Sequence, residues 1–223
     1  MGISDNVRKI LGELPAGCGL VAAVKSRSPE EVLEAVEAGV RIIGENYLQE
    51  AGAHFQLVGR KAPWHFIGHL QKNKVKKAVA LFDLIETVDS LEIAAEIDRR
   101  SGAIGKTTEI FMEVNSGREP QKFGIMPEEV EPLLVKISGF SNIKVMGLMT
   151  MGPACSNPED LRPYFKETRF LWEKIKKCAP ANTEMRYLSM GMSDSFRVAI
   201  EEGANLVRIG AGIFGVRKLT SES

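Results

Sequence analysis

Short apolar runs alternate along the whole chain with longer segments in which apolar residues recur every three or four positions. A buried strand gives a short continuous apolar run, whereas an amphipathic helix gives the longer spacing. The runs predict eight strands, at residues 20–24, 40–43, 64–67, 84–86, 108–114, 143–148, 186–188 and 205–209. Because a helical segment separates each strand from the next, the strands are predicted to be parallel.

This strict alternation favours a closed (β/α)8 barrel over an open sheet, with one extra helix before the first strand. Polar residues before the helical segments predict where the helices begin. Ser4, Ser28, Asp89 and Ser193 are each expected to act as an N-cap. The signal is strongest at Ser28, since Glu31 completes a capping box with it.

The composition excludes several classes of protein. Basic and acidic residues are equal at 29 each, so no nucleic acid or other polyanion is indicated as a partner. The lysines between 72 and 77 are interpreted as a solvated helix face. No apolar run reaches the roughly 18 residues of a membrane helix, and the polar N-terminus lacks a signal-peptide core. The three cysteines share no metal-ligand spacing, which predicts free thiols and a cytoplasmic protein. No linker interrupts the chain, so residues 1–223 are expected to form one domain.

Residues that carry chemistry collect directly after the apolar runs, where a barrel of this kind has its active site. Lys25 ends the first run. A lysine at the lip of an apolar strand can be partly desolvated, which lowers its pKa and makes its amine nucleophilic. The alternative interpretation is a lysine that only marks the end of the strand.

Two glycine-containing turns follow the last two predicted strands. These loops commonly bind phosphate in barrels, through backbone N–H groups. Ser189 and Ser193 add hydroxyl groups there, while Gly191, Gly210 and Gly212 would let the backbone approach a ligand closely. The alternative is that these glycines only form tight turns. In a closed barrel the last strand pairs with the first, so the turns are predicted to lie beside Lys25.

A phosphate site beside a reactive amine suits an aldehyde cofactor that carries a phosphate, and pyridoxal 5′-phosphate (PLP) meets both conditions. Arg208 falls near the end of the last strand and is expected to face the pyridine nitrogen. A guanidinium there would keep that nitrogen unprotonated and weaken the ring as an electron sink. A phosphate contact or an ion pair inside the barrel remains open for Arg208.

Longer motifs fall at these same strand ends. They are Val24-Lys25-Ser26, Gly44-Glu45-Asn46, residues 64–71, residues 147–151, residues 188–193 and Val207-Arg208-Ile209-Gly210. Together they resemble the pyridoxal phosphate homeostasis proteins, the YggS/PROSC family of PLP-binding proteins. The resemblance covers nearly the whole chain. It implies a single barrel of PLP fold type III, similar to the N-terminal domain of alanine racemase, without a second domain.

The resemblance also implies roles for single residues. PLP would be held on Lys25 as a Schiff base, with Arg208 at the pyridine nitrogen and Asn46 beside the cofactor. The phosphate would be held by Ser189, Gly191 and the backbone of 210–212. The complete set of predicted cofactor-binding residues is Lys25, Asn46, Ser189, Gly191, Met192, Arg208, Gly210 and Gly212.

Two positions depart from the family pattern. Ala211 stands where a serine or threonine is expected, which removes a side-chain contact to phosphate, and Val24 stands where the family often has a serine. No metal site is predicted, since His65 and His69 straddle a strand end without a carboxylate or cysteine beside them.

The resemblance implies a protein of PLP homeostasis that holds the cofactor and has little or no catalytic activity. Its expected partners are PLP and PLP-requiring apo-enzymes, and it is expected to be a monomer. An amino-acid racemase is one alternative, but racemisation needs an acid/base on each face of the bound substrate. Tyr47 is the only tyrosine placed near the predicted site. A phosphate-binding barrel of sugar or indole metabolism, with a structural Lys25, is a further alternative.

Overall fold

The computed structural model describes residues 2–215, and its eight strands form a closed barrel in chain order with all neighbours parallel. The strands are β1 (Gly19–Ala23), β2 (Ile42–Glu45), β3 (Trp64–Phe66), β4 (Leu84–Val88), β5 (Thr108–Glu113), β6 (Ile143–Met149), β7 (Thr183–Ser189) and β8 (Leu206–Ile209). The barrel closes where β1 pairs with β8 and places Val21 opposite Arg208. The predicted (β/α)8 barrel is confirmed. The predicted domain of residues 1–223 extends beyond the described residues at both ends.

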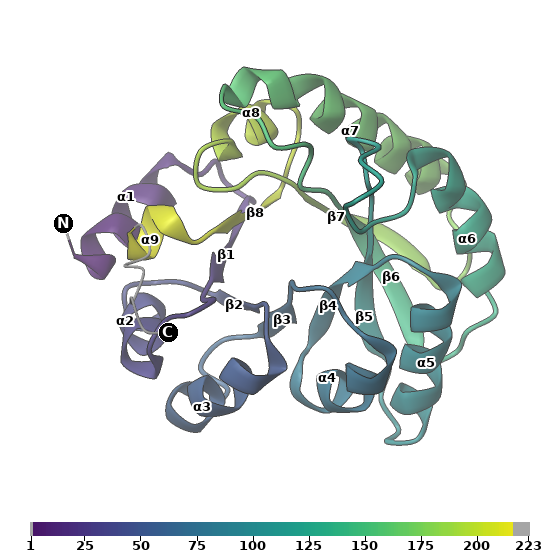
Figure 1. Cartoon of the computed structure of the whole chain (residues 1–223), viewed down its shortest axis with the longest axis horizontal. Helices are drawn as coiled ribbons and strands as arrows, with labels where there is room; N and C mark the ends of the chain where they lie inside the picture. Colours follow the sequence, from purple (N-terminus) through teal and green to yellow (C-terminus); the bar gives the residue numbers. More distant parts are fainter. Residues whose placement is uncertain (1, 216–223) are drawn as a thin grey trace.

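Helices surround the strands (Figure 1). They are α1 (Ile3–Glu13), α2 (Pro29–Glu37), α3 (Leu48–Val58), α4 (Val75–Leu81), α5 (Leu91–Gly102), α6 (Val130–Ile137), α7 (Arg162–Lys177), α8 (Phe196–Glu201) and α9 (Ala211–Phe214), with 3₁₀ turns η1 (Lys72–Lys74), η2 (Pro127–Glu129) and η3 (Pro158–Leu161). The extra helix α1 lies beside α9 (Figure 1), and the Asn6 amide donates to the carbonyl of Ile213 at 2.9 Å.

The apolar residues form two separate clusters. The larger fills the space between strands and helices, and it holds strand residues such as Ile43, Ile110 and Leu188. The smaller lies inside the barrel and contains Val21, Leu84, Phe111, Met146, Met149 and Leu206. Since successive strand residues face opposite sides, a residue an even number of positions from an inner one also faces the barrel axis. That rule determines which side chains reach the site.

The helix starts agree with the sequence at one position and differ at three. Ser28 and Glu31 form the predicted capping box. Asp89 is not the cap of α5, because the Ser90 hydroxyl accepts the N–H of Ile93 instead. Ser4 lies within α1 and donates to Glu34 at 3.0 Å. Ser193 does not cap α8, which begins after Ser195, so its hydroxyl is available elsewhere.

Three strands also differ in extent from the apolar runs. β2 lies two residues later than expected and ends at Glu45, β4 continues to Val88, and β7 begins at Thr183. The cause is polar residues near the ends of these strands. Glu45 and Thr87 are buried and Thr183 is half-buried, and an apolar pattern does not register them.

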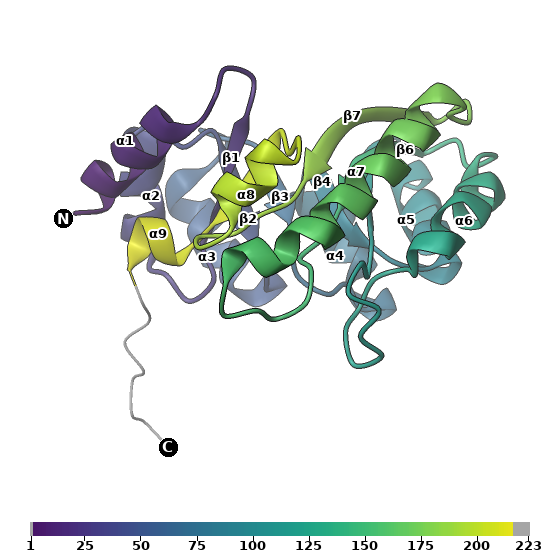
Figure 2. The ribbon, with the colours of Figure 1, turned by 90° about the horizontal axis from the view of Figure 1, so that it is seen from above.

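The loops after the strands form one face of the barrel. Figure 2 shows the loop between β5 and η2 projecting from this carboxyl-terminal face. None of the described helices is long and apolar enough to cross a membrane.

Candidate functional site

Two neighbouring cavities of about 480 Å³ each open at the carboxyl ends of the strands. Lys25, Asn46, Ile67 and Met151 line both. The cavity that we name the β1–β8 cavity is also lined by Ala23, Arg27, Met192, Ser193, Arg208, Gly210, Ala211 and Gly215. The second, the β3–β5 cavity, is also lined by Tyr47, Gly68, His69, Gln71, Lys74, Thr87, Glu113 and Phe123, among others.

Lys25 stands between the two cavities because of its position after β1. Val24 is fully buried in the outer core and its N–H donates to the carbonyl of Gly44 at 3.0 Å, so Lys25 faces the barrel mouth. Ser26 turns the chain away with a φ of 58°. The Lys25 amine lies 4.8 Å from the centre of the Tyr47 ring. The lysine is therefore half-buried and reachable from both cavities.

Arg208 is held inside the barrel by a polar network from several strands. Its guanidinium donates to the Ser189 hydroxyl at 2.7 Å and to the carbonyl of Thr150 at 2.9 Å. Ser189 donates to Glu86 at 2.8 Å, and the other oxygen of Glu86 lies 2.8 Å from Nδ1 of His65. Burial lowers the pKa of Arg208, and the carboxylates of Glu86 and Glu113 oppose this effect. The guanidinium thus has a fixed orientation at the floor of the β1–β8 cavity.

The glycine turns surround the start of α9. Gly191 has a φ of 88°, and a Cβ there would lie 2.6 Å from the Cβ of Ala199. The N–H of Arg208 donates to the carbonyl of Gly191 at 3.1 Å, which joins the two turns. The N–H of Gly212 donates to the Ser193 hydroxyl at 3.0 Å. Ser193, Gly210 and Ala211 consequently meet at one wall of the β1–β8 cavity.

The structure brings most of the predicted residues together. Lys25, Asn46, Met192, Arg208 and Gly210 line the β1–β8 cavity. Gly191 and Gly212 belong to the two turns and are not among the residues that line this cavity. Ser189 points into the barrel instead and is fully buried between Arg208 and Glu86. Of the two serines predicted at these turns, Ser193 is the one that lines the cavity.

The sequence interpretation overlooked Glu113. This residue ends β5, is 4% exposed and lies two positions after Phe111, so it faces the barrel axis. Burial raises its pKa to about 7, the negative charge of Asp89 adds to the effect, and Arg208 opposes it. In the sequence, the only sign that Glu113 faces the barrel axis is its position two residues after Phe111 in the same strand. Among residues 2–215, Glu113 is the one carboxyl that lines the β3–β5 cavity.

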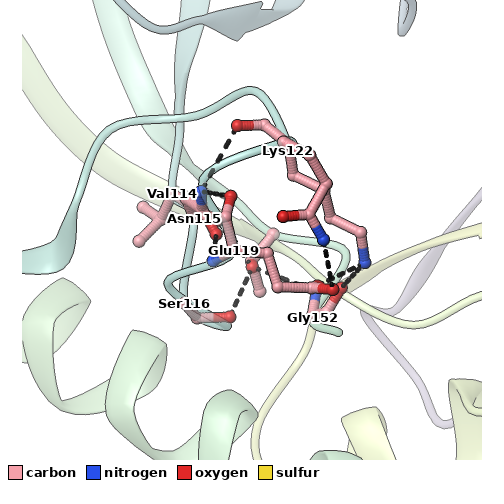
Figure 3. A network of polar contacts seen from close by, with 8 residues as sticks. Val114, Asn115, Ser116, Glu119, Lys122 and Gly152 are labelled. Atoms are coloured by element: carbon pink, nitrogen blue, oxygen red, sulfur yellow. Dashed lines mark hydrogen bonds and ion pairs between the residues drawn. The ribbon is translucent and has the colours of Figure 1, made fainter. Parts of the chain in front are cut away.

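Hydrogen bonds hold the loop after β5 in place at the carboxyl-terminal face of the barrel (Figure 3). The Asn115 amide donates to the carbonyl of Glu119 at 2.9 Å, and the Lys122 amine donates to that of Gly152 at 3.3 Å. These contacts hold the segment that carries Phe123, whose ring stacks on His69 with 3.5 Å between the ring centres. His65 contacts Glu86 instead, so the two histidines have separate surroundings.

Comparison with known proteins decides the family. The family model of the alanine racemase N-terminal domain matches residues 2–218. The pyridoxal phosphate homeostasis protein of Aquifex aeolicus is 39% identical over 218 residues, which cover 97% of this chain and 90% of that protein. The chain belongs to the pyridoxal phosphate homeostasis protein family. A relative from Pseudomonas aeruginosa in this family is 33% identical and covers 96% of each chain. The predicted family is confirmed.

Solved structures agree with membership of this homeostasis family. PipY of Synechococcus elongatus PCC7942 without PLP has a TM-score of 0.90 at 32% identity, covering 96% of this chain and 100% of its own. The same protein with PLP bound gives 0.88 at 31% identity, with the same coverage. Alanine racemase of Clostridium difficile 630 shares the fold, with a TM-score of 0.81 at 15% identity. It is matched over 58% of its length, while all of this chain is covered.

Proposed function

We propose that this protein binds PLP in the β1–β8 cavity, holds it covalently on Lys25 and serves PLP homeostasis with little or no catalysis of its own. The observation that carries the proposal is the convergence of Lys25, Arg208 and the glycine turn at Gly210 on one cavity. The PLP-bound structure of PipY, a relative of the same fold, supports it.

The residues of the cavity fit the cofactor. When bound, PLP supplies an aldehyde carbon that condenses with a primary amine, and Lys25 offers that amine at the cavity wall. Gly210 lets its turn approach β1 closely, because a Cβ there would lie 3.1 Å from the carbonyl oxygen of Ala23. The Ser193 hydroxyl and the backbone around Ala211 would take the phosphate, so the phosphate site does not need a side-chain hydroxyl at 211.

Arg208 favours holding over catalysis. Ser189 and Thr150 keep its guanidinium in place, and a guanidinium donates hydrogen bonds but does not give up its proton. Facing the pyridine nitrogen, Arg208 would leave that nitrogen unprotonated. The ring would then be a weak electron sink, which suits storage of the cofactor.

The tyrosines also argue against racemisation. Tyr47 lies next to Lys25 and is 43% exposed. Tyr187 packs against Phe111 within the barrel, with 5.6 Å between ring centres, and Tyr164 lies on α7. A racemase needs acid/base groups on both faces of its substrate. In addition, the open mouth of the barrel admits water, which efficient catalysis excludes.

The recipients of the cofactor would be PLP-requiring apo-enzymes, and the protein would act as a cytoplasmic monomer. Support for the compartment comes from Cys18, Cys155 and Cys178, which are free thiols in the structure.

The test is the absorbance spectrum of the purified, PLP-loaded protein with borohydride reduction and peptide mapping. The wild type is expected to show a band at the edge of the visible range and to carry the reduced cofactor on the Lys25 peptide. Lys25→Ala is expected to lose both, while Lys136→Ala, at an exposed site on α6, keeps both.

A wild type without the band and without bound cofactor would overturn the proposal, as would cofactor fixed on another lysine. The proposal of little or no catalysis is tested by a racemisation assay with L-alanine, in which we expect no D-alanine to form. Turnover at ordinary enzymatic rates would make the protein a racemase.

A further inference from the structure

Apart from Lys25 and Asn46, the residues that line the β3–β5 cavity have no assigned role in the proposed hold on the cofactor. This cavity is as large as the β1–β8 cavity, at about 480 Å³, and the two share the Lys25 side chain. A group linked to Lys25 is therefore open to attack from the β3–β5 side. Glu113 stands in the wall of this cavity, with Thr87, His69 and Phe123 around it.

Glu113 differs from the other buried acids near the barrel axis. Both oxygens of Glu86 have hydrogen-bond partners, whereas the Glu113 carboxyl makes no side-chain hydrogen bond within residues 2–215. The charges that act on it are those of Asp89, after β4, and Arg208, on β8. The other ionisable groups that line its cavity are Lys25, Tyr47, His69 and Lys74. Its carboxyl is thus free to interact with a ligand.

We propose that the β3–β5 cavity admits a primary amine that takes the cofactor aldehyde from Lys25, and that Glu113 accepts the proton this amine must lose. The inference rests on the proposed function and adds a route by which the cofactor leaves the protein. The ligand class is a primary amine, which arrives as an ammonium ion at neutral pH.

The step balances without any further reactant. An alkylammonium ion has no lone pair for attack until it transfers a proton, and the ionised Glu113 carboxylate takes that proton. The neutral amine would then form a bond to the carbon that Lys25 holds, and one of its remaining protons would pass to the Lys25 nitrogen as the bond from this carbon to Lys25 breaks. Lys25 leaves as an amine and receives the proton back from Glu113. No oxidant or reductant is required.

Other groups of the cavity are less suited to accept the proton. Lys25 is the leaving group. The Thr87 hydroxyl donates to the carbonyl of Gly68 at 2.6 Å, and His69, whose ring stacks on Phe123, is exposed to solvent, unlike the buried Glu113. Burial raises the pKa of Glu113 to about 7. Since a general base works best when its pKa lies near the working pH, the Glu113 carboxylate suits proton transfer at neutral pH.

The experiment uses PLP-loaded protein and two amines of similar size. Ethylamine is an ammonium ion at neutral pH and needs a proton acceptor, whereas methoxyamine is already neutral and needs none. After each time of incubation, borohydride fixes the remaining cofactor, and mass spectrometry measures how much is on Lys25. Glu113→Gln is compared with wild type and with Glu109→Gln, which lies at the opposite end of β5.

Glu113→Gln is expected to slow release by ethylamine at least about tenfold, in line with the loss of a general base. Release by methoxyamine should stay within about twofold of wild type, and Glu109→Gln should behave as wild type with both. An unchanged ethylamine rate in Glu113→Gln would overturn the inference, as would equal slowing with both amines. Wild type that never carries cofactor on Lys25 would instead refute the proposed function.

A second measurement needs no cofactor. Infrared spectra of the PLP-free protein should show one buried carboxyl that loses its proton near pH 7 and is missing in Glu113→Gln. A wild type without this titration would show that Glu113 is not the available base, whatever the release rates are.

Discussion

Single residues of this protein differ in chemistry according to the end of the strand at which they lie. Glu109 and Glu113 belong to the same strand, yet only Glu113 is closed off from water at the cavity end. Desolvation disfavours the ionised form of a carboxyl, so the folded protein holds the proton of Glu113 more tightly than the unfolded chain does.

The pH dependence of stability follows from this difference. The pKa of Glu113 is about 7 in the folded protein and near its ordinary 4.5 in the unfolded chain. Between these values the folded state binds more protons, so folding weakens as pH rises and the full cost is reached above pH 7. Glu113→Gln is therefore expected to gain stability over wild type between pH 5 and pH 8, by up to about 3 kcal/mol.

Urea unfolding of both proteins at the two pH values measures this gain. Glu109→Gln serves as the control, for which we expect the same pH dependence as wild type. A difference between Glu113→Gln and wild type that stays constant with pH would contradict the assignment.

At the scale of elements, the turns after β7 and β8 depend on close backbone packing. Gly191 has a φ of 88°, and a methyl group at this position would lie 2.6 Å from the Cβ of Ala199 and 2.8 Å from the Cα of Phe196. A side chain there is strained by the backbone and has no space. The position of α8 against the barrel, and with it the Ser193 hydroxyl, depends on this glycine.

Gly191→Ala is expected to lower the free energy of unfolding by about 2 kcal/mol or more, since strain and overpacking add. It should also weaken PLP binding, measured by titration of the absorbance band. Gly12→Ala is the matched control, because a Cβ at Gly12 of α1 meets nothing within 4 Å. That variant should keep its affinity and lose no stability, and equal behaviour of the two variants would refute the argument.

For the whole molecule, the buried network around Arg208 connects strands that are distant in sequence. It joins His65 of β3, Glu86 of β4, Ser189 of β7 and Arg208 of β8, and it reaches the carbonyl of Thr150 after β6. Its one carboxylate, Glu86, offsets the buried charge of Arg208. Removing one partner of a buried charge leaves the other uncompensated.

Glu86→Gln is accordingly expected to destabilise the barrel by on the order of 2–4 kcal/mol. Glu92→Gln is the control, because Glu92 forms an exposed ion pair with Lys72 and such pairs contribute at most about 1 kcal/mol. Thermal unfolding of both variants measures the two losses of stability. Equal losses would show that the buried network contributes no more to stability than the exposed ion pair.

Much of this protein is determined by its sequence alone. The alternation of strands and helices depends on local apolar spacing, so the barrel, the mouth that holds Lys25 and the pairing of the first strand with the last all follow from it. The capping box at Ser28 is equally local. Motifs at the strand ends were long enough to identify the homeostasis family.

Only the tertiary structure decided how the inward-facing polar residues are paired. Ser189 and Glu86 are 103 positions apart and meet because the barrel closes. Ser189, predicted as a phosphate ligand, therefore makes its hydrogen bonds inside the barrel, while Ser193 lines the β1–β8 cavity. Glu113 likewise acquires its raised pKa from burial and from charges on other strands. The physical reason is that apolar spacing depends on residues that are close together in the chain. Desolvation and hydrogen bonding instead depend on neighbours that the closed barrel brings together.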